Sequence, residues 1–169
     1  MANGEQPSRL ALGVLALGVL AADQLSKYGV EKFTAPGSLR VVVPGALNLV
    51  HTNNPGVAFG LFADSASPML APMLVMFSVG VIALLLWLLL TNRAGGWLGQ
   101  MGLALILGGA LGNVLDRVVR RSVTDFIDFH VGNHHWYTFN VADSAIVAGA
   151  ALVVLELLRD WRHAAQERA

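Results

Sequence analysis

Long apolar runs separated by short polar stretches dominate this chain. Four of these runs have about the 20 residues that a helix needs to cross the roughly 30 Å apolar core of a bilayer. They cover residues 10–30, 68–90, 97–115 and 139–158. We therefore predict a mainly α membrane protein with four transmembrane helices, which places both termini on one side. The other residues lie mostly in two loops, 31–67 and 116–138, and residues 1–169 are expected to form a single integral membrane domain.

Composition supports lipid as the solvent of this chain. Of its 169 residues, 55% are hydrophobic and only 13% are charged, whereas soluble proteins have about 25% charged residues. The net charge of zero gives no indication of a nucleic-acid partner. Basic residues divide almost evenly between the two predicted sides, so the positive-inside rule assigns no orientation. The absence of cysteine excludes disulfides and thiolate chemistry.

The first apolar run has two interpretations. Arg9 followed by the apolar residues 10–22 resembles a secretory signal. However, the run continues to Val30, which is full spanning length, and Asp23 and Lys27 are spaced so that they can pair on one helix face. These features favour an uncleaved membrane anchor.

Part of the first loop has the pattern of a hairpin. Apolar residues alternate around a Pro44-Gly45 turn, which predicts two short strands (Val41, Val43, Leu47 and Leu49). Turn formers and small residues follow at 51–60. The edges of such strands can pair with an extended peptide. A loop that merely packs on the bundle explains the same pattern.

Small and polar residues occupy the end of the third run. Its glycines favour close helix packing (Gly102, Gly108, Gly109 and Gly112). Asn113, Asp116 and Arg117 follow at positions i, i+3 and i+4 and therefore share one face. These residues form either an interfacial ion pair or a buried network that holds other groups in place.

Asp125 and Asp143 are the strongest candidates for chemistry. An ionised side chain at membrane depth costs several kcal/mol, so a chain that retains one usually does so for function. Asp143 shares a helix face with Asn140, and the 18 residues from Asp125 allow the two aspartates to meet. Two adjacent carboxylates retain one proton between them, which is the arrangement of an aspartic protease. The alternative is that Asp143 only stabilises the N-terminus of its helix.

Five stretches of the chain resemble the bacterial lipoprotein signal peptidases, or signal peptidase II. They occur in the family's order at residues 23–27, 54–59, 108–117, 123–126 and 139–143. The resemblance implies that Asp125 and Asp143 form the catalytic pair. It also implies that eight residues support the site or line the substrate: Asp23, Lys27, Asn54, Gly56, Asn113, Asp116, Arg117 and Asn140. The chain departs from the family at Arg121, where glycine is usual, and at Thr124, where valine is common, which concerns loop geometry rather than the catalytic assignment.

The resemblance also implies a function and a location. The expected activity is that of an aspartic endopeptidase, which removes the signal peptide of a prolipoprotein before a cysteine that carries a diacylglyceryl group. No cofactor is expected, membrane lipid is the other partner, and the protein is expected to be a monomer. The family sits in the bacterial inner membrane with its active site facing the periplasm and its termini in the cytoplasm. Its fold adds a small periplasmic β cradle and a short amphipathic helix, for which residues 63–71 or part of 28–36 are candidates.

Other mechanisms fit the sequence less well. Its histidines include no His-Glu-x-x-His pattern, so we expect no metal site (His51, His130, His134 and His135). Ser26 and Lys27 are adjacent, so on a helix they point about 100° apart and make a poor catalytic dyad. Ser144 is better explained as a helix-interface residue. Two alternatives of other classes are a proton-coupled transporter, which usually has acids near the midplane, and a non-enzymatic assembly subunit.

Overall fold

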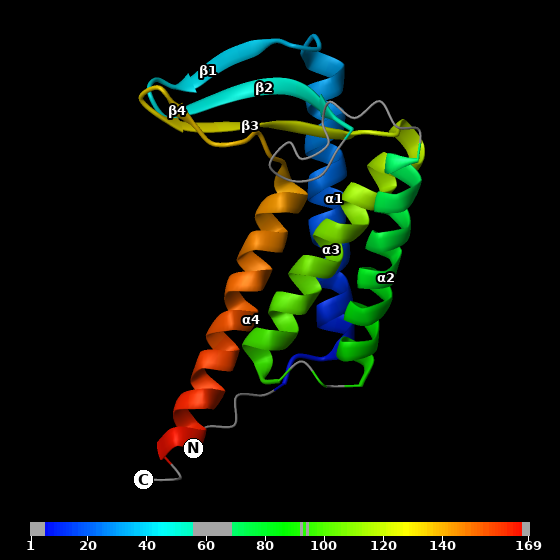
Figure 1. Ribbon diagram of the computed structural model, residues 1–169, viewed down its shortest axis with the longest axis vertical. Coiled ribbons are helices and arrows are strands. Elements are labelled where there is room, and N and C mark those ends of the chain that lie inside the picture. Colours follow the sequence, from blue (N-terminus) through cyan, green and yellow to red (C-terminus); the bar gives the residue numbers. More distant parts are fainter. Residues whose placement is uncertain (1–5, 56–68, 92, 94, 167–169) are drawn as a thin grey trace.

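The computed structural model describes residues 6–55, 69–91, 93 and 95–166. Four long helices form an antiparallel bundle, and a small sheet lies across one end of it (Figure 1). The helices are α1 (Arg9–Phe33), α2 (Leu70–Leu90), α3 (Trp97–Arg120) and α4 (Val141–Gln166). All four are long and apolar enough to cross a membrane, with mean hydropathies from 1.4 to 2.8. We call the end of the bundle that carries the sheet the sheet end.

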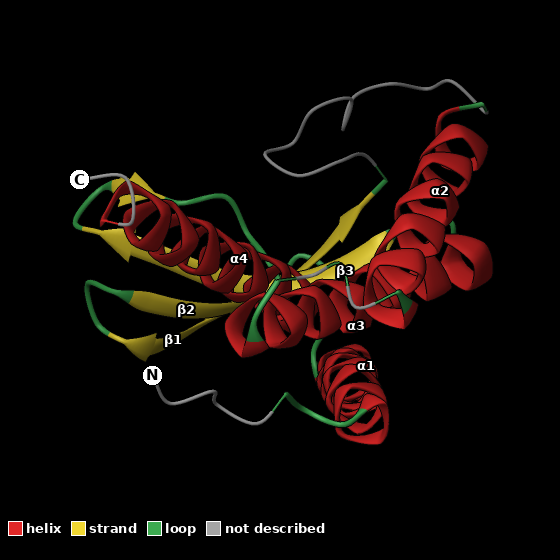
Figure 2. Cartoon of the chain, turned by 90° about the horizontal axis from the view of Figure 1, so that it is seen from below, coloured by secondary structure: helices red, strands yellow, loops and turns green. Residues whose placement is uncertain are grey.

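Helix α3 is the centre of the bundle. It packs against α1, α2 and α4, as the view along the helices shows (Figure 2). Its glycines permit this close approach, because a Cβ on Gly108 would lie 2.5 Å from the backbone oxygen of Ala16. Gly102 and Gly149 face each other in the same way, since a Cβ on either would lie within 2.6 Å of the other's oxygen. The packing role predicted for the glycines is confirmed.

The sheet has four antiparallel strands in the order β1-β2-β3-β4. They are β1 (Leu39–Val43), β2 (Leu47–Asn54), β3 (Val123–Val131) and β4 (His134–His135). The β1-β2 pair confirms the predicted hairpin. Strand β3 pairs with β2, so Asp125 lies opposite Thr52 in the register. Because β3 directly follows α3, the sheet is held against the end of the bundle.

The predicted elements differ from the structure in their ends. The third helix continues to Arg120 rather than stopping at 115, and the fourth continues to Gln166 rather than 158. The predicted loop 116–138 was wrong in a more important way, since it contains β3 and β4. The alternating β-branched and aromatic residues of β3 are typical of a strand, but the prediction considered only the long apolar runs on either side of it.

The short amphipathic helix was predicted at two places. The candidate within 28–36 is wrong, because residues 28–33 are the last turns of α1 and the chain turns extended at Thr34. The candidate at 63–71 falls mostly outside the described residues, and α2 begins at Leu70.

Candidate active site

The site lies at the sheet end, where α3, β3 and the start of α4 meet. Asn140 immediately precedes α4, and its side-chain oxygen accepts from the backbone N–H of Asp143 at 2.9 Å. In return, the Asp143 carboxylate accepts from the backbone N–H of Asn140 at 3.3 Å. This reciprocal arrangement is a capping box, and it fixes the position of the Asp143 carboxylate. The prediction that Asp143 serves the helix N-terminus is therefore confirmed, and it is compatible with a second role.

Asp125 approaches the same asparagine from strand β3. Its side chain is only 2% exposed, and one oxygen accepts from the Asn140 amide at 2.7 Å. The other oxygen accepts from the Asn54 amide at 3.0 Å. Because Asn140 bonds to both aspartates, the structure brings the two predicted carboxylates to one point. We call Asp125 and Asp143 the amide-bridged pair.

Burial, and to a smaller extent the nearby charge of Asp143, raise the pKa of Asp125 from an ordinary value of 3.8 to about 6. Hydrogen bonds from Asn54 and Asn140 oppose this shift without cancelling it. An amide N–H offers only a partial positive charge, so it compensates a buried carboxylate less than a cation does. Asp125 can therefore carry a proton at a pH where an exposed aspartate is ionised.

Asp128 shows the opposite behaviour three residues along the same strand. It is also buried, and burial alone would raise its pKa, but hydrogen bonds from Asn48 and His135 outweigh burial and lower it. Asn48 donates at 2.8 Å, and the His135 ring lies 2.9 and 3.1 Å from the two carboxylate oxygens. Burial on β3 thus does not by itself make an aspartate a proton carrier.

A second group of buried charges lies beneath the pair. The Lys27 ammonium is 2.8 Å from Asp23 and 2.6 Å from Asp116, and all three side chains are fully buried. Arg120 adds a second cation, 2.5 Å from Asp116. Two carboxylates are thus matched by two cations, which is the condition for burying charge without a large penalty. We call Asp23 and Asp116 the ammonium-bridged pair.

Asn113 connects the two pairs. Its amide donates to Asp143 at 2.8 Å, while its oxygen lies 3.2 Å from the Lys27 ammonium and 3.3 Å from the Asn140 amide. Asp23 adds another connection, since it accepts from the backbone N–H of Ala142 at 2.9 Å and so holds the start of α4. Movement of the ammonium-bridged pair would therefore displace the capping box of Asn140 and Asp143.

Close packing of α3 against α1 leaves room for the ammonium-bridged pair. A Cβ on Gly112 would lie 2.5 Å from the Asp23 carboxylate, so only glycine leaves room for it there. The predicted pairing of Asp23 with Lys27 is confirmed. Of the two interpretations for the end of the third helix, the buried network is the correct one for Asn113 and Asp116. Arg117 donates to the backbone oxygen of Asn113 at 3.2 Å and interacts electrostatically with Asp143, Asp125 and Asp116.

The structure accounts for both departures from the family pattern. Arg121 ends α3 in the left-handed conformation, with φ at +61°. Glycine adopts that conformation without cost, whereas another residue pays about 1 to 2 kcal/mol. Thr124 donates its hydroxyl to Glu31 at 2.7 Å, a bond that valine cannot make. Glu31 also pairs with Arg120 at 3.3 Å.

Sequence reasoning found most of the site but missed two residues and could not place one. Gln24 was missed as a participant, although it donates to Asp23 at 3.1 Å and to Asp116 at 3.0 Å. Its polar side chain within an apolar run was the available signal. Glu31 was also missed, and nothing in its local sequence distinguishes it from an exposed helix-end charge. Gly56 lies outside the described residues.

The competing schemes find little support in the described part of the chain. The Ser26 hydroxyl donates to the backbone oxygen of Asp23, and the Lys27 ammonium is taken up by its two aspartates. Ser144 donates to the backbone oxygen of Asn140. The residues that the structure describes include no group of three side chains placed to hold a metal ion.

Fold and site together define a multi-pass membrane protein with a polar, carboxylate-containing site at one end of its helix bundle. Comparison with known proteins makes the class more specific. A family model described as signal peptidase (SPase) II matches residues 15–159. The chain belongs to the signal peptidase II family and is therefore a peptidase.

Individual relatives agree with this assignment. A lipoprotein signal peptidase of Solibacter usitatus is 45% identical over 159 residues, covering 92% of this chain and 94% of the relative. One from Burkholderia mallei is 42% identical over 151 residues and covers 89% of each chain. Two solved structures described as a bacterial membrane enzyme match with TM-scores of 0.81 and 0.80, each at 26% identity. They cover 92% of this chain, and 92% and 97% of their own lengths.

Proposed function

We propose that this protein is an aspartic endopeptidase that removes the signal peptide from diacylglyceryl-modified prolipoproteins, cutting the bond before the lipidated cysteine. The curated relatives are lipoprotein signal peptidases, which supports the substrate class. The observation that carries the mechanism is the bridging of Asp125 and Asp143 by one asparagine. Proximity of two buried carboxylates favours a state in which the pair holds one proton.

The reaction follows from that state. The ionised carboxylate takes a proton from a water molecule as the water oxygen attacks the scissile carbonyl carbon. The protonated carboxylic acid donates its proton to the carbonyl oxygen, which forms a neutral tetrahedral intermediate. When the C–N bond breaks, the departing nitrogen takes a proton from the pair, and one hydroxyl of the intermediate returns its proton to the pair as the carbonyl re-forms in a carboxylic acid. The pair ends the cycle with one proton, as it began.

The neighbouring residues have supporting roles in this proposal. Asn140 and Asn113 orient the two carboxylates, and Asn54 holds Asp125 from strand β2. The guanidinium of Arg117 interacts with both aspartates and limits the build-up of negative charge. Lys27, Asp23 and Asp116 act below the reacting groups, since they fix the start of α4 and the end of α3. We also assign Gly56 to the support of the site, on resemblance alone.

The position of the pair at the sheet end suits a lipid-bearing substrate. A diacylglyceryl group holds the adjacent peptide bond near the membrane surface, which is where the ends of spanning helices lie. We propose that the sheet end faces the periplasm across the bacterial inner membrane and that both termini are cytoplasmic. Three of the four acids lie at this end, since Asp116 is in the last turns of α3, Asp125 in β3 and Asp143 in the first turn of α4, which gives the transporter alternative little support.

A cleavage assay with matched substrates tests the proposal. The detergent-solubilised chain is incubated with one precursor, either lipidated or unlipidated at its cysteine, and the products are identified by mass spectrometry. We expect a shortened product that begins at the lipidated cysteine, no product from the unlipidated precursor, and no effect of a chelator. Equal cleavage of both precursors would refute the substrate assignment, and loss of activity with the chelator would refute the mechanism.

A further inference from the structure

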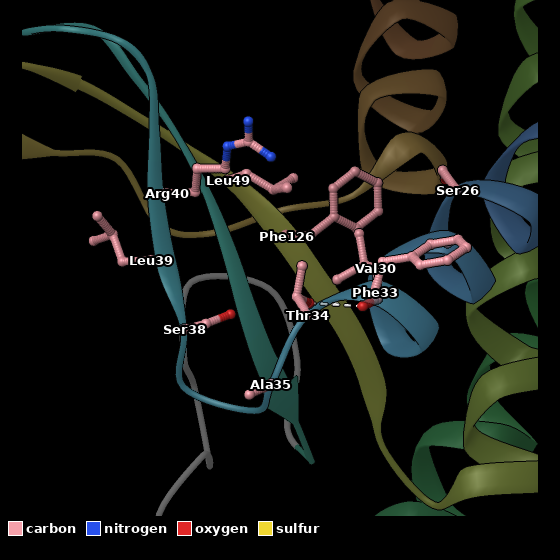
Figure 3. A pocket seen from close by; sticks show the side chains of 11 residues that line it. Ser26, Val30, Phe33, Thr34, Ala35, Ser38, Leu39, Arg40, Leu49 and Phe126 are labelled. Atoms are coloured by element: carbon pink, nitrogen blue, oxygen red, sulfur yellow. Dashed lines mark hydrogen bonds between the residues drawn. The ribbon is translucent and has the colours of Figure 1, made fainter.

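A separate pocket lies between the outer turn of α1 and the β1-β2 hairpin. Its volume is about 600 Å³, within the range of about 300 to 1,000 Å³ that is common for small-ligand sites. Its apolar wall comes from Val30, Phe33, Leu49 and Phe126, whose side chains gather between the strands and the helix end (Figure 3). None of the residues that bridge the two aspartate pairs lines this pocket.

The pocket is continuous with the lipid-facing surface of the bundle. Leu25, Tyr28 and Phe33 on the outer turns of α1 are 71%, 54% and 78% exposed. Residues of this kind are exposed on a spanning helix because lipid covers them. Since α1 spans the bilayer and Phe33 is its last residue, the pocket opens at the depth of the lipid headgroups.

The charges around the pocket are positive. Arg40 lines it, and the Lys32 ammonium lies 5.5 Å from the ring of Phe33, another lining residue. None of the described lining residues is acidic. Glu31, the nearest acid in sequence, is occupied by Arg120 and Thr124. An apolar wall beside two cations at headgroup depth suits a molecule with acyl chains and an anionic head.

Gly29 is one of the residues that line the pocket. It lies within α1, where glycine costs about 1 kcal/mol relative to alanine. The glycines of α3 recover that cost by close packing, but a Cβ on Gly29 would meet nothing within 4 Å. Gly18, on the same helix, also has open space beside it but does not line the pocket. Gly18 therefore offers a matched control.

We propose that this pocket binds one anionic phospholipid, with its phosphate near Arg40 and Lys32 and an acyl chain against Val30, Leu49 and Phe126. This inference does not depend on the proposed peptidase mechanism, because the site is separate from the aspartates. The lipid would hold the hairpin and β3 against α1, since the pocket is lined by all three.

Native mass spectrometry of the full chain in detergent tests the inference directly, without any substrate. Phosphatidylglycerol and phosphatidylcholine are titrated in parallel, and the retained lipid is counted. We expect one phosphatidylglycerol to be retained in preference to phosphatidylcholine. Arg40→Gln should lower that preference about fivefold, the equivalent of one lost basic contact. Gly29→Leu should abolish retention of the lipid, and Gly18→Leu should retain it like the unaltered protein.

Other outcomes would overturn the inference. Equal retention of the two lipids by the unaltered protein, or full retention by Gly29→Leu, would show that the pocket is not a lipid site. Competition by glycerol phosphate would show that a free phosphate ester suffices and that the acyl contacts are not needed. Leucine is a better helix former than glycine, so Gly29→Leu should fold. If Gly29→Leu does not fold, the preference of Arg40→Gln for phosphatidylglycerol over phosphatidylcholine tests the inference: an unchanged preference would overturn it.

Discussion

Two pairs of buried carboxylates lie at the sheet end of this bundle, and they are stabilised in different ways. Asp23 and Asp116 flank an ammonium at 2.8 and 2.6 Å, and Arg120 supplies a second cation. Asp125 instead accepts from the side-chain amide of Asn140, and Asp143 accepts from the backbone N–H of the same residue. An ammonium supplies a full opposite charge, whereas an amide supplies only a dipole. The first pair can therefore act as a fixed structural support, whereas the weaker compensation of the second pair favours the shared proton that we propose.

The difference assigns separate roles to residues that look alike in the sequence. Four aspartates and several polar partners occur within or near the apolar runs, and spacing alone does not separate structural acids from reactive ones. The partners of each aspartate separate the two kinds, because a carboxylate that exchanges protons needs neighbours that leave it free to do so. The comparison predicts that the two pairs respond in opposite ways to substitution.

The largest expected effect is on turnover. We expect Asp125→Asn and Asp143→Asn each to lower cleavage of a lipidated precursor by about 10³-fold or more, because each removes an acid or base of the reaction. Initial rates on purified protein measure the effect. Asp128→Asn is a matched control on the same strand and should cleave at close to the normal rate. Normal turnover by either of the first two variants contradicts the proposed mechanism.

The next effect is on folding and concerns the ammonium-bridged pair. Lys27→Met should lower the free energy of unfolding by about 3 to 5 kcal/mol, since it leaves Asp23 and Asp116 buried beside an apolar side chain. Thermal unfolding in detergent measures the loss. Arg93→Met, which removes an exposed cation near the opposite end, should change stability by about 0.5 kcal/mol or less. If the Lys27→Met protein is as stable as this control, the ammonium-bridged pair has no structural role.

A smaller effect separates the two functions of Asn140. Serine is also a good N-cap, so Asn140→Ser should keep the cap on Asp143 while losing the amide that bonds to Asp125. We expect stability to change by about 1 kcal/mol or less and the cleavage rate to fall about 10- to 100-fold. Asn140→Ala loses both functions and should be less stable than the serine variant. Unchanged cleavage by Asn140→Ser would show that the bridge is dispensable.

The smallest effect lies at the junction of α3 and β3. Arg121→Gly should raise the free energy of unfolding by about 1 kcal/mol, because it relieves the left-handed conformation at φ +61°. Since this junction leads into the strand that carries Asp125, the variant also tests whether a relaxed turn alters turnover. A fall in stability would mean that the Arg121 side chain contributes more than its backbone costs.

The sequence predicted the helices and the Asp23–Lys27 pair for a simple physical reason, whereas most of the candidate site residues came from the family resemblance. Spanning helices are determined by length and hydrophobicity, and the i,i+4 spacing of Asp23 and Lys27 is a local property. Strand β3 has the alternating pattern of a strand, but its pairing with β2 joins residues about 70 to 80 positions apart, which no local pattern records. The role of Asn140 was found only in outline, because its bond to Asp125 depends on that same strand.

Contacts between distant residues also explain the remaining omissions. Gln24 and Glu31 take part in the site through partners on α3 and β3, which the local sequence does not reveal. The pocket beside Gly29 has the same origin, since α1, the hairpin and β3 each supply part of its lining. Local chemistry and the family resemblance therefore indicated the candidate pair Asp125 and Asp143, and only the tertiary fold assigned their partners.

The pH dependence of stability reports whether Asp125 holds a proton that it can share with Asp143. The pKa of Asp125 rises from 3.8 to about 6 on folding, so its ionised form is disfavoured in the folded protein. That cost is absent below about pH 4, grows between about pH 4 and 6, and is complete above that range. Asp125→Asn removes it because asparagine stays neutral.

The measurement is the unfolding midpoint of the unaltered protein and of Asp125→Asn from pH 4 to pH 8. We expect the midpoint of the variant to rise relative to the unaltered protein by a few degrees between about pH 4 and 6 and then to stay level. A difference that is independent of pH, or that falls as pH rises, would show that Asp125 is ionised throughout and would contradict a proton shared with Asp143.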